Sequence, residues 1–494
     1  MDATECLYVI LFCYGALFFF DRFFKSCSMY PYIAFLNGTG LNIGFLRISW
    51  RTTAFNRTLL KIGTKYKNLL NIWFDIGIYV TIILLPISIG VLLYAAFQIF
   101  VFSSTTDKVA SNKDTIIEPI IPGVTSPLNE IGYYAITLLI SSCLHELGHA
   151  IAAVREDIHI IEVGCSAFFI LPVAFVIISN DQLQTLNVKK KLRVLCAGVW
   201  HNLVIAVIAY LIFISLPLLF MPFYALNRGV YVSEVSHKSP LRGQRGIEVG
   251  DIIVGINEHK IYNDQTWFQA LTRTIKQKPG YCVETDFVHA LDESVVTEHH
   301  EINGLIECCG PNKGQNLCFE YLEASDGIVQ LPPHMCLPAR KIVEHAKTLC
   351  YSGTCSLDLH CIKPVLPNAT SLLSISRYRK DHVIYIGHPS DVFYSVQVSA
   401  YVPKTWFLSS KFAERIDLLL KYLVVFSLGL VIVNIIPCWY LDGEHIIVAV
   451  VQLVLARRIQ SKLVKDVISL SLTIFGTVFL ILVILGTLLM KLFY

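Results

Sequence analysis

The chain has 494 residues, of which 54% are hydrophobic and only 16% are charged. Soluble globular domains carry about 25% charged residues, so this composition excludes an ordinary soluble protein and indicates a membrane protein. The formal net charge is only +3, and no basic block of the kind that follows a phosphate backbone is present, which excludes nucleic acid as the expected partner.

Apolar runs define the expected membrane spans. Five runs reach the roughly 20 residues that a transmembrane helix needs. They are residues 76–102, 131–154, 194–227, 422–441 and 467–490. The shorter run 6–20 lacks the basic start and the small-residue cleavage site of a signal peptide, so we expect it to be a sixth span.

Basic residues set the expected orientation, because cytosolic loops are enriched in lysine and arginine. The loop 25–69 contains basic residues and no acidic residue, and two further basic loops lie at 189–193 and 457–465. If these three loops are cytosolic, the segments 103–130 and 228–415 and both chain ends lie in the lumen.

Cysteines give a second sign that 228–415 is lumenal. Eight of the 15 cysteines lie between Cys282 and Cys361. An even cluster is typical of disulfides in an oxidising compartment, and the absence of paired CxxC spacings disfavours a zinc ribbon. The glycosylation sequon at Asn368 lies in this segment, whereas those at Asn37 and Asn56 lie in the expected cytosolic loop and should stay unused.

The motif His-Glu-Leu-Gly-His at residues 145–149 lies inside the apolar run 131–154. His145 and His149 share one face of a helix and can hold one zinc ion, while Glu146 is the usual general base. Ionisable residues at membrane depth are costly and indicate function. The distance from His145 to Arg155 is about 15 Å along a helix, which places the site inside the membrane but nearer the cytosolic face.

Asp442 is the candidate third ligand, because catalytic zinc usually takes three protein ligands. It follows the run 422–441, which crosses the membrane in the same direction as the motif helix and so reaches a similar depth. Pro437 breaks a helix and Gly443 permits a turn, and irregular backbone at membrane depth is tolerated only when it lines a cavity or is buried in protein. Taken alone, Asp442 would be better explained as a helix cap or turn residue.

Together these motifs resemble the site-2 protease family of intramembrane zinc metalloproteases. The pattern consists of HExxH at 145–149, GxxxN at 198–202 and NxxPxxxLDG at 434–443, and the similarity runs from about residue 70 to the end. It implies zinc as the cofactor, with His145, His149 and Asp442 as ligands and Glu146 as the base.

The same resemblance makes Asn434, Pro437 and Asn202 the candidate substrate-binding residues. Asn434 is implied to help hold an unwound substrate, although it can also be explained by a hydrogen bond to a neighbouring helix. Gly198 and Asn202 are better explained as packing residues at a close helix crossing.

The lumenal segment matches the family's animal members, which have a PDZ-like domain with a cysteine-rich insertion. Alternation at 229–235 predicts a strand, the GDxIxxIN run at 250–257 resembles a PDZ core, and 382–403 is expected to supply the remaining strands. The apolar segment 157–180 contains a glycine and a proline and predicts a re-entrant hairpin whose edge could pair with an extended substrate.

The expected fold is therefore an α-helical polytopic membrane protein with about six transmembrane helices, a re-entrant β-hairpin and a lumenal PDZ-like α+β domain. The expected segments are the first span 1–24, a basic membrane-associated cytosolic loop 25–69, a span 70–103, a lumenal loop 104–130, the HExxH helix 131–156, the hairpin 157–192, a span 193–227, the PDZ-like domain 228–415 with its insertion at about 282–375, the NxxPxxxLDG helix 416–453, a cytosolic loop 454–465 and the last span 466–494.

The resemblance implies a metalloendopeptidase of the Golgi or endoplasmic reticulum. Its substrates would be single-span proteins first cleaved on the lumenal side, namely membrane-tethered transcription factors of sterol and unfolded-protein responses, and membrane lipid would be the other partner. One alternative is a membrane protease for prenylated proteins, but no glutamate after the motif lies in an apolar run to serve as third ligand. The other is an inactive scaffold that binds transmembrane helices, which the presence of all three ligands and the base disfavours.

Overall fold

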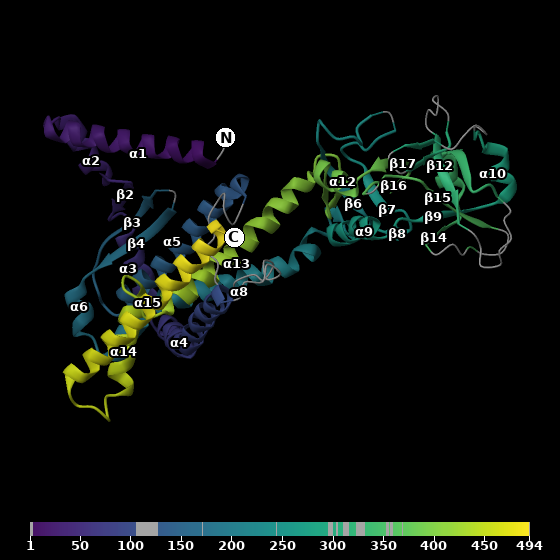
Figure 1. The fold of residues 1–494 in the computed structure, drawn as a ribbon. Coiled ribbons are helices and arrows are strands. Elements are labelled where there is room, and N and C mark those ends of the chain that lie inside the picture. The colour runs from purple at the N-terminus through teal and green to yellow at the C-terminus, as the bar shows by residue number, and fades with distance from the viewer. Residues whose placement is uncertain are drawn as a thin grey trace. The chain divides into compact units, whose positions relative to one another are not determined.

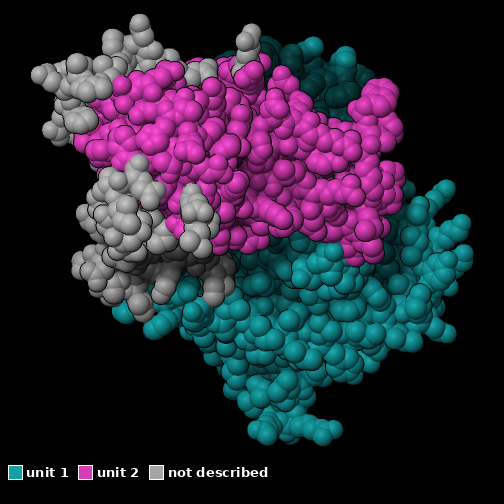
Figure 2. Space-filling model, turned by 90° about the vertical axis from the view of Figure 1, so that its right-hand side faces the viewer, with its two compact units in different colours: residues 1–214, 418–494 teal, residues 215–417 magenta. Residues whose placement is uncertain are grey.

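The computed structural model describes residues 3–104, 127–169, 171–243, 245–294, 300–302, 305–309, 316–322, 331–351, 355, 359–367 and 369–493 (Figure 1). The chain divides into two compact units (Figure 2). Unit 1 comprises residues 1–214 and 418–494, and unit 2 comprises 215–417. Unit 2 is thus inserted between two helices, α8 (Ala197–Phe220) and α13 (Ser410–Ile435).

Five helices in the described part of the chain are long and apolar enough to cross a membrane. They are α4 (Lys67–Ser104), α5 (Ile131–Arg155), α8, α13 and α15 (Lys462–Phe493). The first apolar run forms α1 (Ala3–Ser26), which is not among these five and carries Asp21, Arg22 and Lys25 in its last turns. The five spans agree with a polytopic membrane protein, and the sixth span stays a prediction.

A four-stranded antiparallel sheet in unit 1 contains the predicted hairpin. Its strands are β1 (Leu41–Gly44), β2 (Arg47–Thr52), β3 (Ile160–Phe168) and β4 (Leu171–Ile178), in the order β1-β2-β3-β4. The first two strands come from the basic loop 25–69, which also forms α2 (Tyr30–Thr39) and α3 (Asn56–Lys65). We did not expect this pairing, because alternation within one segment does not reveal a partner more than 100 residues away.

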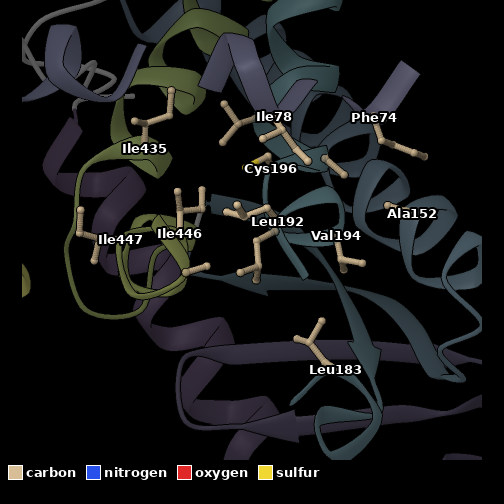
Figure 3. Close-up of a cluster of buried hydrophobic side chains, with 14 of the residues drawn as sticks. Phe74, Ile78, Ala152, Leu183, Leu192, Val194, Cys196, Ile435, Ile446 and Ile447 are labelled. Carbon is tan, nitrogen blue, oxygen red and sulfur yellow. The ribbon is translucent and has the colours of Figure 1, made fainter. Parts of the chain in front are cut away.

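A buried apolar cluster holds the short helices that border the candidate site. It gathers side chains from α4, α5, α13, α6 (Asn180–Thr185), α7 (Val188–Leu195) and α14 (Asp442–Val454). In Figure 3, Leu192 and Val194 of α7 lie in one cluster with Ile446 of α14, Ile78 and Phe74 of α4. Because interiors of this kind are closely packed, the cluster fixes where α7 and α14 meet the HExxH helix.

Unit 2 contains a six-stranded antiparallel sheet in the order β17-β16-β7-β6-β18, with β8 paired to β7. The strands are β6 (Val230–Val235), β7 (Ile252–Ile256), β8 (His259–Lys260), β16 (Ser371–Arg377), β17 (Lys380–Gly387) and β18 (Val396–Ser399), and α9 (Asp264–Lys276) and α12 (Pro389–Ser395) accompany them. Asn263 and Thr266 form a capping box that starts α9. The strands expected at 229–235, 250–257 and 382–403 therefore join one sheet.

The cysteine-rich insertion forms a second sheet in the order β13-β12-β15-β9-β14. Its strands are β9 (Gly280–Val283), β12 (Asn316–Tyr321), β13 (His334–Pro338), β14 (Thr348–Cys350) and β15 (His360–Pro364), with α10 (Thr285–Leu291) and α11 (Ala339–His345). All eight cysteines form disulfides, which confirms that prediction: Cys282–Cys355, Cys308–Cys318, Cys309–Cys336 and Cys350–Cys361. Asn368 lies outside the described residues.

Short elements complete the described chain. The turn η2 (Leu128–Glu130) precedes α5, and two short strand pairs join β5 (Tyr224–Ala225) to β19 (Val402–Pro403) and β10 (His300–Ile302) to β11 (Leu305–Glu307).

Candidate metal centre

The two histidines of the motif lie on one face of α5, and Asp442 meets them from α14. The Nε2 atoms of His145 and His149 are 3.1 Å apart. Asp442 Oδ2 lies 2.9 Å from His145 Nε2 and 3.2 Å from His149 Nε2. Asp442 is the first residue of α14, so its side chain leaves the helix start toward α5. The three residues predicted from separate parts of the sequence therefore form one group that could hold a metal ion.

Neighbouring groups determine which ring nitrogens face this centre. His149 Nδ1 lies 2.8 Å from the carbonyl oxygen of Val194. A carbonyl oxygen only accepts hydrogen bonds, so Nδ1 carries the proton and the lone pair of Nε2 points to the centre.

Asn202 orients the other ring. Its amide nitrogen lies 3.0 Å from His145 Nδ1, while its buried Oδ1 has no partner among the described residues. Turning the amide by 180° exchanges these nearly isosteric atoms and lets Oδ1 accept from the N–H of His145. The lone pair of His145 Nε2 then also faces the centre, which is the usual arrangement of metal-binding histidines.

The donor set fits zinc. Two imidazole nitrogens and one carboxylate oxygen, all acceptors, converge at 2.9–3.2 Å from one another. Ligand atoms about 2.1 Å from a tetrahedral zinc ion are about 3.4 Å apart, and three protein ligands are typical of catalytic zinc. Acceptor atoms packed this closely repel one another unless a cation lies between them.

Gly198 of α8 lies directly against the two rings. A Cβ atom at this position would be 2.4 Å from His149 Nε2 and 2.6 Å from His145 Nε2. A side chain here would occupy the space of the candidate ligand atoms. Gly198 therefore does more than allow two helices to pack closely.

Glu146 lies between α5 and the sheet. Its Oε2 accepts a hydrogen bond of 3.0 Å from the backbone N–H of Val176 on β4. One helical turn earlier, Ser142 Oγ accepts a 2.8 Å bond from the N–H of Ala174. Nothing in the sequence singles out Ser142, because a serine in an apolar helix carries no signal of its own.

The NxxPxxxLDG segment interrupts the helix as expected. α13 ends at Ile435 and α14 begins at Asp442. Pro437 is buried, and α15 supports the interruption, because Thr477 Oγ1 accepts from the N–H of Trp439 at 3.2 Å. Within the described residues, the side chain of Asn434 has no hydrogen-bond partner.

Gly443 has a different role from the turn that we expected. The positive φ in this segment, +69°, belongs to Tyr440. At Gly443 a Cβ would lie 2.0 Å from the carbonyl oxygen of Ile436. Glycine is therefore needed for the close approach of two backbone segments.

An ion-pair network holds α7, the helix that presents the Val194 carbonyl. Arg193 Nε lies 2.6 Å from Asp75 Oδ1 on α4, and its Nη1 lies 2.8 Å from Glu156 Oε1 at the end of α5. The Glu156 side chain is only 1% exposed. In the sequence, Arg193 was visible only as one residue of a basic loop, so its contacts were not predicted.

Comparison with known proteins identifies the family. A family model for peptidase family M50 matches residues 133–480, more than half of the chain. The chain belongs to peptidase family M50. It is also 25% identical over 445 residues to a membrane-bound transcription factor site-2 protease homologue of Arabidopsis thaliana, and the alignment covers 80% of this chain and 83% of the relative. The resemblance to site-2 proteases is thus confirmed, and M50 membership makes the chain a metallopeptidase homologue.

Proposed function

We propose that this M50 chain is an intramembrane zinc metalloendopeptidase that hydrolyses a peptide bond within the membrane segment of a single-span substrate. The observation that carries the proposal is the meeting of Asp442 of α14 with His145 and His149 of α5, a helix able to span a membrane that also carries Glu146. Binding of a transmembrane helix alone would not require such a buried donor set.

The chain's own residues have separate roles in this reaction. His145 and His149 would hold zinc through Nε2, and Asp442 would hold it through Oδ2. Bound there, zinc would supply the Lewis acidity that polarises a carbonyl and activates water near neutral pH. Glu146 transfers a proton from the attacking water to the leaving amine nitrogen.

The substrate has to be extended at the cleaved bond, because a transmembrane helix keeps its carbonyl groups hydrogen-bonded. β4 is an edge strand of the unit 1 sheet and lies along α5, where it contacts Glu146. We propose that the substrate pairs with this edge, and that Asn434, Pro437 and Asn202 border the cleft that receives it. The side-chain amide of Asn434, which has no hydrogen-bond partner among the described residues, supports this role.

Unit 2 is proposed to be the lumenal PDZ-like domain. β18 is an edge strand, and beside it a cavity of about 590 Å³ is lined by Trp267, Phe268, Phe393 and other residues of α9, α12 and β18. Edge strands of this kind bind peptides by strand addition. The four disulfides support a lumenal location.

The remaining parts of the proposal concern the orientation in the membrane, the domain boundaries and the substrates. The basic loops would be cytosolic, α1 would be a sixth span, and the domain boundaries would be those expected from the sequence. Unit 2 would exclude substrates that still carry a lumenal domain or capture their trimmed ends. Membrane-tethered transcription factors of sterol and unfolded-protein responses, in the Golgi or endoplasmic reticulum, are the proposed substrates, and the site-2 protease homologue among the relatives supports them.

A cleavage assay tests the activity. A single-span reporter already trimmed on its lumenal side is expressed in cells that lack the native activity, with the intact chain or with Glu146→Gln. We expect release of the cytosolic fragment by the intact chain alone, with zinc still bound to Glu146→Gln because that residue is not a ligand. Equal release by both chains would refute the mechanism.

A further inference from the structure

The edge of β4 that faces α5 is already occupied by side chains. The N–H groups of Ala174 and Val176 donate to Ser142 Oγ and Glu146 Oε2 at 2.8 and 3.0 Å. Positions four apart on a helix are separated by about 6 Å, and positions two apart on a strand by about 6.8 Å, so the two pairs match in spacing. Ala174 is buried and Val176 is half-buried, so both amides need an acceptor.

A substrate strand that adds to β4 requires the same two amides. Within the described residues, β4 pairs with β3 on its other side, and the opposite edge of the sheet is β1. An incoming segment therefore has to offer carbonyl oxygens in place of the Ser142 hydroxyl and the Glu146 carboxylate. A helical segment cannot do this, because its carbonyls accept bonds within the helix.

We propose that Ser142 and Glu146 form a latch on β4 that only an unwound substrate segment releases. The inference rests on the proposed proteolytic function and makes Ser142 a positioning residue that determines specificity for extended segments. Release of the Val176 amide also leaves both carboxylate oxygens of Glu146 available for proton transfer. Cleavage is thereby coupled to strand pairing, and intact transmembrane helices near the site are spared.

Hydrogen exchange tests the latch without any cleavage. The purified, zinc-loaded full chain is compared with Ser142→Ala and with the matched control Ser141→Ala. Ser141 lies on the same helix, but its hydroxyl shares a 3.0 Å hydrogen bond with Ser427 of α13. We expect Ser142→Ala to speed exchange in the peptide 171–178, and Ser141→Ala to leave it unchanged. Wild-type exchange in Ser142→Ala would overturn the latch.

Cleavage kinetics test its consequence. Two reporters differ only in an Asn-Pro or a Leu-Leu pair within the membrane segment, so that one segment unwinds and the other stays helical. We expect the wild type to cleave the Asn-Pro reporter in preference to the Leu-Leu reporter. Because the substrate no longer has to displace the Ser142 hydroxyl, we expect the KM of Ser142→Ala to be about fivefold below that of the wild type, the effect of one hydrogen bond, with kcat unchanged. An equal loss of kcat on both reporters, with their preference unaltered, would indicate a merely structural serine and refute the proposal. If wild type cleaves neither reporter, the proposed function fails, and the exchange measurement alone still decides the latch.

Discussion

A methyl group at position 198 should disable the metal centre while leaving the fold intact. In Gly198→Ala the new Cβ would stand 2.4 Å from His149 Nε2, about 1 Å inside the contact distance of about 3.4 Å. His149 has little freedom to move, because its Nδ1 donates a hydrogen bond to the carbonyl oxygen of Val194 and its side chain is only 11% exposed. Metal ligands tolerate displacements of about 0.2 Å, so the required shift is several times too large.

We expect the zinc affinity of Gly198→Ala to fall at least about 100-fold, or about 2.8 kcal/mol. Competition with a chelator on the purified full chain measures this, and the zinc content of the protein gives a second readout. Gly429→Ala is the matched control, because it places the same methyl group on the membrane helix α13 with no atom within 4 Å. If Gly198→Ala folds and binds zinc with wild-type affinity, the assignment of these histidines as ligands is wrong.

Two further predictions concern ion pairs. Arg193→Met leaves the buried Glu156 carboxylate with Lys190 at 3.4 Å, so we expect a loss of about 3 kcal/mol in stability and weaker zinc binding, measured by thermal unfolding and chelator competition. Arg193→Lys should restore part of both, and wild-type values in the methionine variant would contradict the network. In unit 2, burial raises the pKa of Asp251, but hydrogen bonds from its basic partners and from a backbone amide have the larger, opposite effect. The net result is a pKa below the usual range of an aspartate. The stability from this carboxylate is therefore present above about pH 4, the unfolded value, and is lost as the pH falls through the folded pKa. Asp251→Asn should lose this stability at neutral pH and should no longer become less stable in acid. If hydrogen exchange in β7 depends on acid in the variant as it does in the wild type, the assignment of this effect to Asp251 is refuted.

Much of the candidate site was readable from the sequence, because its signals are local. The histidine spacing follows from the 3.6-residue helical period, and the cost of a charge at membrane depth singles out Glu146 and Asp442. Composition indicated the disulfides, an apolar segment interrupted by a glycine and a proline indicated the hairpin, and alternation indicated strands of unit 2. These properties depend on neighbours in the chain, so the sequence alone determined them.

Only the tertiary structure decided the contacts between distant segments. No local pattern predicts that β2 pairs with β3, that the carbonyl of Val194 orients His149, or that Ser142 binds the edge of β4. Disulfide connectivity is of the same kind, since eight cysteines allow about 105 pairings. Backbone carbonyls and amides carry no residue-specific signal, and their partners are determined by how helices and strands pack.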